Sequence, residues 1–331
     1  ADIRRKIALF CNVSPDAVIE ALDASTIYEV PLLMEKENLD SIVLKKLNIT
    51  EPTEVKLEAW KNFLNKLTNP TKEIHIGLIG KYVELKDSYK SISEAIIHAG
   101  SVNDCKVNVE WIHSESLTDE NVAEKLKGLK GILVAPGFGN RGIEGKIEAI
   151  KFARENNVPF FGICLGMQMA VIEYGRNVLG LADAHSVEMD AKTTNPVINM
   201  MEEQKKIKMM GGTMRLGAYP CEIEEGSLAH QIYGDLNITE RHRHRYEFNN
   251  DYLEAYEKAG MKASGKNPET GLVEIVELPN HPFFIGVQYH PELKSTVERP
   301  APLFVSFIGA AKKYNETKGA LISGILQREM A

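Results

Sequence analysis

The sequence predicts an α/β fold, in which a mostly parallel, twisted sheet carries helices on both faces and follows a short, mainly helical segment. One observation predicts the sheet, one the helical segment and one the boundary between them. From residue 74 onward, short apolar runs alternate with stretches of helical periodicity, which is the order that produces a parallel sheet covered by helices. The first 70 residues show helical spacing without such runs. Residues 68–71, Thr-Asn-Pro-Thr, break the pattern and mark the boundary.

The composition is that of an ordinary globular protein. The chain has 331 residues, of which 44% are apolar and 26% charged, and its length suggests about two domains. A net charge of −7 gives no strong attraction to nucleic acid or to a membrane surface. No apolar run approaches the roughly 18 residues that a membrane span needs, and no secretory signal is evident. We therefore expect neither nucleic acid nor membrane as a partner.

The cysteines indicate a reducing compartment. There are four, without close pairing, which argues against a disulfide framework or a zinc ribbon. We expect a cytoplasmic protein with no metal bound by this chain. The four are Cys11, Cys105, Cys164 and Cys221.

The first region, residues 1–70, is predicted to be helical. Ser14 followed by Pro15 resembles a helix start, with an N-cap and a proline at the first helical position. Leu57, Trp60 and Leu64, followed by Leu67, recur at helical spacing and form one apolar face. Because the sequence begins at Ala1 without an initiator Met, we expect a fragment or a processed product.

The second region, residues 71–315, alternates strands and helices, and residues 316–331 form a tail. Gly100 is predicted to end the first of these helices. Strands are predicted at 74–79, 107–112, 131–135, 159–163, 273–278 and 283–289, and helices at 87–99, 119–126, 145–155, 165–174, 302–314 and from 318.

Cys164 is the strongest candidate for a nucleophile. It follows the predicted strand 159–163 directly and precedes a helix, within Gly162-Ile-Cys164-Leu-Gly166. Glycines on both sides permit a sharp turn that exposes the central side chain in a strained conformation. The start of the following helix favours a thiolate there. The N–H of Leu165 would point toward an oxyanion formed at the attacked carbon. A lone cysteine would instead be interpreted as a core residue.

His290 and Glu292 are the candidate base and its orienting group. His290 ends the predicted strand 283–289, and Pro291 precedes Glu292. The carboxylate can fold back on the imidazole, fix its tautomer and stabilise its cation. His290 would take the thiol proton and return it to the leaving group. His-Pro-Glu alone would be interpreted as a surface turn, so the prediction depends on its pairing with Cys164.

The loop Gly137-Phe-Gly139-Asn-Arg-Gly142 fits two interpretations. It matches G-x-G-x-x-G between a strand and a helix, as in dinucleotide-binding proteins. That fingerprint also requires an acidic residue about 20 residues further on, where Asn156-Asn157-Val158 stands instead. We therefore favour an oxyanion loop, in which the N–H of Gly137 lies beside that of Leu165.

These motifs, in this order, resemble the class I glutamine amidotransferases of the Cys-His-Glu type. The resemblance covers nearly the whole chain and is closest to the branch of the family that aminates UTP to CTP. Residues 4–32, including 5–11 and 25–31, resemble the end of that branch's synthetase domain. Further matching segments are 80–91, 212–217 and 240–247.

The resemblance implies an activity and a set of roles. Glutamine is hydrolysed, and the ammonia aminates UTP with ATP and Mg²⁺ in a synthetase domain, while GTP activates the glutaminase. No cofactor is implied for this chain itself, and the family forms homo-oligomers, usually tetramers. The triad corresponds to Cys164, His290 and Glu292, the glutamine site to Gly137, Leu165, Gln168, Glu188 and Arg245, and the GTP region to Arg215. Glu188 suits the substrate ammonium and Arg245 its carboxylate.

The sequence departs from the family pattern at two places. Where the family has Pro-Gly-Gly before Phe-Gly, this chain has Ala135-Pro136-Gly137, which keeps the N–H donor of Gly137. No G-x-x-x-x-G-K-[ST] phosphate loop occurs. We therefore expect only about 70 residues of the synthetase domain here, no productive binding of UTP and ATP, and glutaminase activity at most.

Alternatives remain for the activity and for one motif. The chain could be a stand-alone γ-glutamyl hydrolase with the same triad, or a non-catalytic assembly module. The run 241–245, Arg-His-Arg-His-Arg, could form a nucleic-acid patch or a His-x-His metal pair, because alternate residues of a strand share a face. No aromatic platform or further metal ligand is evident nearby.

Overall fold

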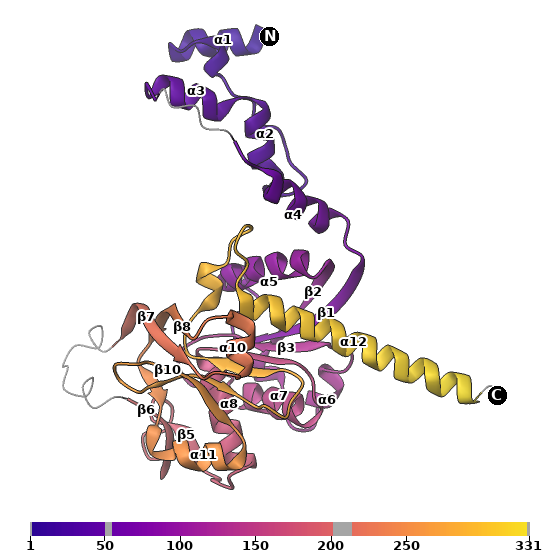
Figure 1. Cartoon of the computed structure of the whole chain (residues 1–331), viewed down its shortest axis with the longest axis vertical. Coiled ribbons are helices and arrows are strands. Elements are labelled where there is room, and N and C mark those ends of the chain that lie inside the picture. The colour runs from indigo at the N-terminus through magenta and orange to yellow at the C-terminus, as the bar shows by residue number, and fades with distance from the viewer. Residues whose placement is uncertain (1, 50–54, 201–213, 330–331) are drawn as a thin grey trace. The chain divides into compact units, whose positions relative to one another are not determined.

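The computed structural model describes residues 2–49, 55–200 and 214–329, with side chains as far as residue 316. Contacts divide the chain into two compact units, Ala1–Asn69 and Pro70–Ala331 (Figure 1). Each unit is described by itself. In the described ranges, no helix combines the length and the apolar character that crossing a membrane requires.

The first unit is built from short helices around one aromatic cluster. The Tyr28 and Phe63 rings lie 4.9 Å apart, edge to face, and Trp60 donates its indole N–H to the carbonyl of Tyr28 at 2.7 Å. Phe63 is buried on α4, the helix predicted from its apolar spacing. The elements are α1 (Asp2–Cys11), η1 (Pro15–Ala17), η2 (Ile27–Glu29), α2 (Val30–Lys36), α3 (Leu39–Lys46) and α4 (Glu58–Thr68).

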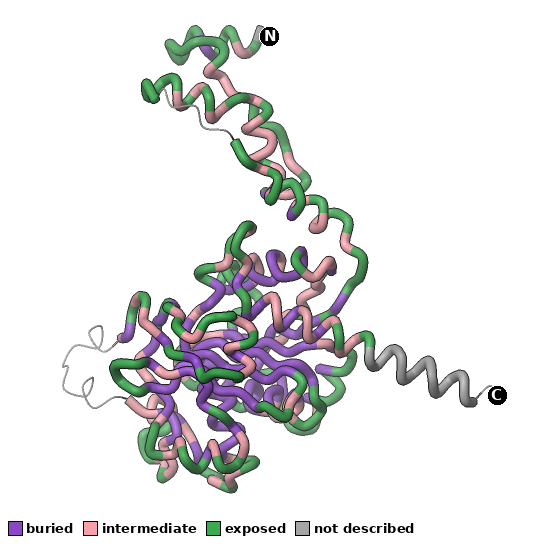
Figure 2. The backbone as a smooth tube through the Cα atoms, viewed as in Figure 1, coloured by how far each residue is buried: buried purple, intermediate pink, exposed green. Residues whose placement is uncertain are grey.

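This unit buries little of its apolar surface. Pro15 begins only a single 3₁₀ turn, and the Ser14 side chain makes no capping bond. Leu9 and Phe10 are 80% and 90% exposed, and Figure 2 shows mostly exposed and intermediate positions along this part of the chain. Large exposed apolar residues mark a surface that fits a further protein partner.

A nine-stranded sheet runs through the described part of the second unit. Its order is β2-β1-β3-β4-β12-β11-β10-β7-β8. The first five strands of this order pair in parallel, and the remaining pairs are antiparallel. The strands are β1 (Lys72–Gly80), β2 (Cys105–His113), β3 (Gly131–Val134), β4 (Phe160–Ile163), β7 (Arg215–Ile223), β8 (Asn237–His244), β10 (Lys262–Lys266), β11 (Val273–Glu277) and β12 (Phe284–Val287).

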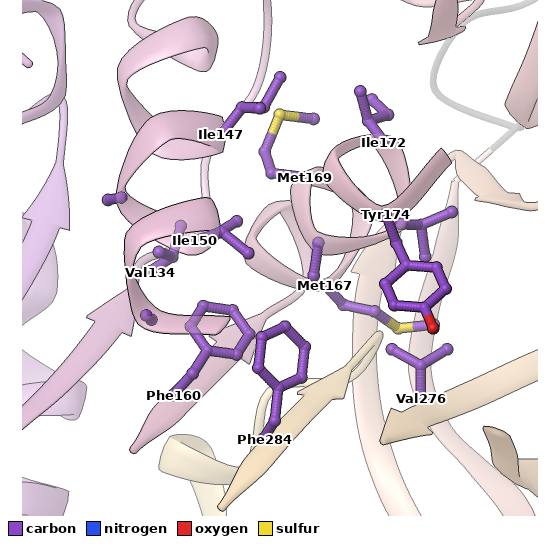
Figure 3. Packing of buried hydrophobic residues seen from close by; sticks show 14 of the residues in the cluster. Val134, Ile147, Ile150, Phe160, Met167, Met169, Ile172, Tyr174, Val276 and Phe284 are labelled. Carbon is purple, nitrogen blue, oxygen red and sulfur yellow. The ribbon is translucent and has the colours of Figure 1, made fainter. Parts of the chain in front are cut away.

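Helices pack on both faces of the parallel half, as predicted. On one face, α7 (Ile143–Glu155) and α8 (Leu165–Asn177) cover β3 and β4, and Figure 3 shows Ile150 of α7 near the Phe160 ring of β4 and Ile147 near Met169 of α8. On the other face, α5 (Lys90–Val102) and α12 (Pro302–Glu329) form a second apolar core with the sheet. The sheet is thereby buried on both sides (Figure 2).

Smaller elements complete the unit. A three-stranded sheet has the order β5-β6-β9, and Tyr256 of α11 is buried against it beside Phe248. The elements are β5 (Ala184–Ser186), β6 (Asn195–Met200), β9 (Tyr246–Phe248), α6 (Val122–Lys125), α10 (Leu228–Tyr233), α11 (Leu253–Ala259), η3 (Lys86–Tyr89), η4 (Ser114–Ser116), η6 (Asn250–Tyr252) and η7 (Pro291–Lys294).

Two predicted boundaries were wrong. Gly100 lies inside α5 and does not end it; a Cβ there would come within 2.8 Å of the Cys105 carbonyl oxygen, so the glycine permits a close approach of the backbone. The two closing helices are one, because α12 continues from Pro302 to Glu329. Residues 316–329 therefore continue this helix.

Candidate active site

Cys164 lies at a sharp turn between β4 and α8. Its backbone has φ 53° and ψ −103°, a region that side chains other than glycine rarely adopt. Its N–H donates to the Val287 carbonyl at 2.7 Å, which ties the turn to β12. A Cβ on Gly166 would lie 2.2 Å from the Val134 carbonyl oxygen. The glycine allows the turn to pack against β3, and the predicted strained elbow is present.

His290 follows β12 and is held on two sides. Its backbone N–H donates to the carbonyl of Arg241 at 2.8 Å, and its Nδ1 lies 2.8 Å from Oε1 of Glu292. The side chains of His290 and Glu292 are 12% and 5% exposed. The imidazole therefore has one ring nitrogen fixed by a carboxylate, and it lines a cleft shared with Cys164.

The electrostatics favour a charged imidazole. Burial lowers the pKa of His290, but the nearby Cys164 side chain and the Glu292 carboxylate outweigh burial and raise that pKa to about 10. Nε2 is buried and makes no hydrogen bond of normal geometry to the described residues, but an interaction with the Cys164 side chain contributes to the raised pKa of His290. This nitrogen is left available to exchange a proton with the Cys164 sulfur, as a nucleophile–base pair requires.

Gly137 and Leu165 lie together next to Cys164, as predicted for an oxyanion hole. A Cβ on Gly137 would lie 3.6 Å from Cδ2 of Leu165 and 3.2 Å from Cε of Lys81. Leu165 is the first residue of α8, where backbone N–H groups have no partner within the helix. The two residues predicted to form the oxyanion hole are therefore neighbours, and their role toward an oxyanion stays a prediction.

A small cavity beside Cys164 brings together four of the predicted glutamine contacts. Its lining includes Gly137, Gln168, Glu188 and Arg245 together with Cys164. A carboxylate and a guanidinium within one cavity match the charged ends of an amino acid. Leu165 does not line this cavity, and its predicted contribution is through the backbone.

Glu188 and Gln168 also have structural partners. One oxygen of Glu188 accepts the N–H of Gly139 at 3.1 Å, which holds the 137–142 loop. The Gln168 amide donates to the carbonyl of Tyr246 at 2.9 Å and to Oε1 of Gln288 at 3.2 Å. Both side chains are therefore fixed in place before any ligand enters, which reduces the ordering needed on binding.

A wider cleft opens from Cys164 on the side of His290 and Glu292. Phe138 lines it, 39% exposed, and the Arg243 guanidinium lies 5.9 Å from the centre of the Phe138 ring. Tyr82 and Leu85 form its exposed apolar edge. The nucleophile is thus reached from two spaces, a small polar cavity and a broader cleft.

Sequence reasoning missed Gln288. Its Nε2 donates to the Cys164 sulfur at 3.7 Å, because β12 pairs in parallel with β4 and their carboxyl ends lie together. Gln288 stands two residues before His290. Alternate residues of an extended chain share a face, so the position of His290 was a usable signal.

Two buried lysines near the nucleophile were missed as well. Lys81 Nζ donates to the carbonyl of Phe138, and Lys146 Nζ donates to the carbonyl of Ala135 at 2.7 Å. Both hold the predicted oxyanion loop. Lysines are almost never fully buried, so the sequence alone gave no reason to place Lys146 inside.

Arg215, the residue predicted to lie in the GTP region, belongs to a buried ion-pair cluster. Arg215 is 7% exposed, and its guanidinium pairs with Glu274 at 2.9 Å and with Glu247 at 3.3 Å. Its role toward GTP stays a prediction. Gly212 and Thr213, from the same predicted segment, lie outside the described residues.

The run 241–245 divides by side-chain direction. His242 and His244 are buried, and the distance between His242 Nδ1 and His244 Nε2 is 2.8 Å. Burial lowers the pKa of His242 to about 3, and that of His244 is also lowered by burial. Arg241 and Arg243 are exposed. Within the described ranges, no group of three His, Cys, Asp or Glu residues is arranged to hold a metal ion.

Comparison with known protein families identifies the class to which this fold belongs. Residues 84–310 match the family described as glutamine amidotransferase class-I. The glutaminase domain of CTP synthase from Trypanosoma brucei, solved with bound acivicin, superposes with a TM-score of 0.69 and 41% identity over 72% of this chain and 94% of that one. The chain therefore belongs to the class-I glutamine amidotransferases.

Within that class, the chain belongs with the CTP synthases. Residues 1–49 match the family described as CTP synthase N-terminus. CTP synthase of Cytophaga hutchinsonii is 65% identical over 96% of this chain and 59% of its own length, and that of Flavobacterium psychrophilum is 66% identical over 95% and 58%. The chain thus spans somewhat more than half the length of these relatives.

Proposed function

We propose that this chain carries out the glutamine-hydrolysing half of CTP synthesis, with Cys164 as nucleophile and His290 and Glu292 as its base and orienting group. The observation that carries the proposal is the small cavity beside Cys164, which holds Glu188 and Arg245 in its lining. The carboxylate of Glu188 and the guanidinium of Arg245, next to a strained nucleophile, select an amino acid whose side chain reaches the sulfur.

Binding would place glutamine by its α-groups. Glu188 takes the ammonium and Arg245 the carboxylate, each through a charge-assisted hydrogen bond. The side-chain carbonyl then lies at the sulfur, with its oxygen toward the N–H groups of Gly137 and Leu165. Gln168 helps to shape the wall of the cavity.

The chemistry would proceed through a thioester. The Cys164 sulfur attacks the amide carbon, and the oxygen becomes an oxyanion held by the two backbone donors. His290 gives its proton to the amide nitrogen, the C–N bond breaks, and ammonia leaves. Water, deprotonated by His290, then attacks the thioester carbon, which releases glutamate and the Cys164 thiol.

The use of the ammonia is a proposal for the whole protein. UTP, ATP and Mg²⁺ would bind to the part of the synthetase domain that the chain does not contain, and GTP would activate the glutaminase. The exposed apolar side chains of the first unit, among them Leu9 and Phe10, support a partner domain there. A homo-oligomer, tetrameric as in the family, completes this proposal.

Mass spectrometry after treatment with acivicin tests the nucleophile. We expect one covalent adduct on Cys164, absent in Cys164→Ala, and competition by excess glutamine. Buried Cys221, whose pKa burial raises, serves as the internal control and should stay unlabelled. A well-folded sample without an adduct would contradict the enzymatic proposal and favour a non-catalytic assembly module.

Substrate assays separate the remaining possibilities. Ammonia released from glutamine supports the proposal, whereas rapid turnover of γ-glutamyl peptides with none of glutamine would indicate a stand-alone hydrolase. CTP formed by this chain alone, from UTP, ATP and glutamine, would show that the synthetase activity does not need the rest of the protein.

A further inference from the structure

Lys146 is a buried cation for which the proposed reaction has no assigned role. It lies on α7 and is 0% exposed, among the largest fully buried side chains of the described residues. Its Nζ donates to the carbonyl of Ala135 at 2.7 Å. No carboxylate in the described ranges forms an ion pair with it. Burying an ammonium group without a counter-charge is costly, so its position calls for a functional explanation.

Ala135 begins the loop that presents Gly137. Its own N–H donates to the carbonyl of Ile79 at 3.0 Å, and Lys146 takes its carbonyl oxygen. The next residue is Pro136, whose ring fixes φ. Because the Ala135–Pro136 peptide is held at its oxygen and φ of Pro136 is fixed, only ψ of Pro136 remains to set the direction of the Gly137 N–H.

The far side of the loop is held by different groups. Lys81 Nζ donates to the carbonyl of Phe138, and Glu188 accepts the N–H of Gly139. Lys146 therefore fixes the chain before Gly137, while Lys81 and Glu188 fix it after. Oxyanion donors are effective only when they are held in place before the reaction.

We propose that Lys146 is a positioning residue for the oxyanion hole: its buried ammonium group holds the Ala135 carbonyl, orients the Gly137 N–H and adds positive charge beside Cys164. This inference deepens the proposed glutaminase function and rests on it. The ammonium group touches neither substrate nor sulfur, so it acts through the loop and through its charge.

The charge of Lys146 changes near neutral pH. Burial, first, and the Lys81 ammonium lower the pKa of Lys146 to about 7, while the Cys164 side chain raises it. These are the ionisable groups that act on it. Acidic groups on α7 and on the elements packed against it pair elsewhere: Glu144 with Arg176, Glu148 with Lys151, Glu173 of α8 with Arg154, and Glu115 of η4 with Arg141.

The direction of the pH effect follows from the charge. Below the pKa, the ammonium makes a charge-assisted bond to Ala135 and favours negative charge on the sulfur and on the oxyanion. As pH rises through about 7, that charge is lost and the reaction should slow. Lys146 would then set the alkaline limb of the pH–rate profile.

The test compares Lys146→Met with Lys151→Met. Lys151 lies on the same helix, is 31% exposed and pairs with Asp119, so its substitution controls for a changed α7. The readouts are kcat and KM for glutamine hydrolysis, in the full-length protein where this chain alone is slow, and the rate at which acivicin labels Cys164 in this chain, both between pH 6 and pH 9.

For Lys146→Met we expect a loss of about ten-fold in kcat, smaller than the loss of an oxyanion donor itself, with KM changed little. The alkaline limb should disappear from both profiles. Lys146→Gln, which keeps a neutral N–H donor, should recover part of the rate but not the alkaline limb. Lys151→Met should behave as wild type.

Opposite results separate this inference from the proposed function. If wild type turns over glutamine and Lys146→Met shows the same rate and pH profile, the positioning role is wrong and the glutaminase stands. If wild type neither turns over glutamine nor forms an adduct, the proposed function fails. The ¹³Cε resonance of Lys146 then decides separately, because a titration midpoint above pH 9 would show that the residue is not the switch.

Discussion

The two halves of the large sheet achieve burial by different means. In the parallel half, β3, β4 and β12 are apolar and fully buried, and β1 is buried from Ile76 to Gly80. In the antiparallel half, charged side chains lie inside: Arg215 of β7 and Glu274 of β11 are buried, together with Glu247 of β9 in the small sheet. The first half is organised around a nucleophile, and the second around an ion-pair cluster.

The comparison shows where charge is tolerated. In the antiparallel half, one guanidinium lies between two carboxylates, and burial raises the pKa of Glu247 to about 8 and of Glu274 to about 7 although Arg215 lowers both. In the parallel half, buried Lys146 has no carboxylate and bonds only to the backbone of the loop. The buried charges of the antiparallel half thus pair with each other, whereas the buried charge of Lys146 is directed at the loop that carries Gly137.

The largest expected effect is on the triad. Glu292→Gln keeps the shape of the side chain but cannot stabilise the His290 cation, so kcat should fall by about 10⁴-fold, as for a comparable orienting carboxylate. Steady-state glutamine hydrolysis measures it, and the free energy of unfolding should change little. A variant with near-normal kcat would show that Glu292 is structural.

The second effect tests the antiparallel half. Arg215→Met leaves Glu247 and Glu274 buried without a cation and should destabilise the fold by about 3–5 kcal/mol. Both carboxyl groups have raised pKa values in the folded state, so the folded state binds more protons than the unfolded state from about pH 4.5 to pH 8. The loss should therefore be larger at pH 8 than at pH 6.

Urea unfolding of Arg215→Met at both pH values provides the measurement. Arg141→Met, which removes a half-exposed guanidinium that lies 3.8 Å from Glu115, is the control and should cost less than 1 kcal/mol, as surface pairs do. Equal stability of Arg215→Met and wild type at pH 8 would show that the buried cluster does not depend on its cation.

The third prediction is that Lys146→Met stabilises the fold, whereas Arg215→Met destabilises it. Lys146 has a lowered pKa in the folded state, so the unfolded state binds more protons between about pH 7 and pH 10.5 and stability rises with pH through that window. Below it the buried ammonium is a cost, and Lys146→Met should gain about 2 kcal/mol at pH 6. The gain should shrink toward pH 10, as thermal unfolding in parallel buffers would show. A variant that is less stable than wild type at pH 6 refutes this account.

The smallest expected effect concerns the elbow in the parallel half. Gly166→Ala would place a Cβ 2.2 Å from the backbone oxygen of Val134, which cannot move like a side chain. We expect a loss of about 1–3 kcal/mol, typical of overpacking, and slower labelling of Cys164. Thermal unfolding and acivicin kinetics measure the two. Gly128 has open space around it but a φ of +92°. Gly128→Ala therefore measures the cost of backbone strain without a steric contact.

The parallel half could be predicted from sequence because its signals are local. Apolar runs predicted β1 to β4, and Gly162 and Gly166 on either side of Cys164 predicted the sharp turn at that residue. The buried residues of β7 and β8 include Arg215 and His242, which single-residue tendencies place outside. For the same reason no local pattern assigned a role to Lys146.

The site residues were predicted from motif and resemblance together. The structure places Cys164, His290 and Glu292 around one cleft and four of the glutamine contacts around one cavity. Gln288 was missed although it stands two residues before His290 in an extended segment and so shares its face; the parallel pairing of β12 with β4 brings that face to Cys164. Residues 315–317, Asn-Glu-Thr, contain neither proline nor glycine, and α12 runs through them without a break.

The amide of Gln288 has a consequence for selectivity. It has the same functional group as the proposed substrate and stands 3.7 Å from the sulfur, yet it presents its nitrogen, while its oxygen is engaged by Gln168. The amide nitrogen, and not the carbonyl carbon, is the atom that meets the sulfur, so the sulfur is not aligned to attack this carbonyl. The protein thus keeps an internal amide beside its reactive sulfur and avoids acylating itself through orientation alone.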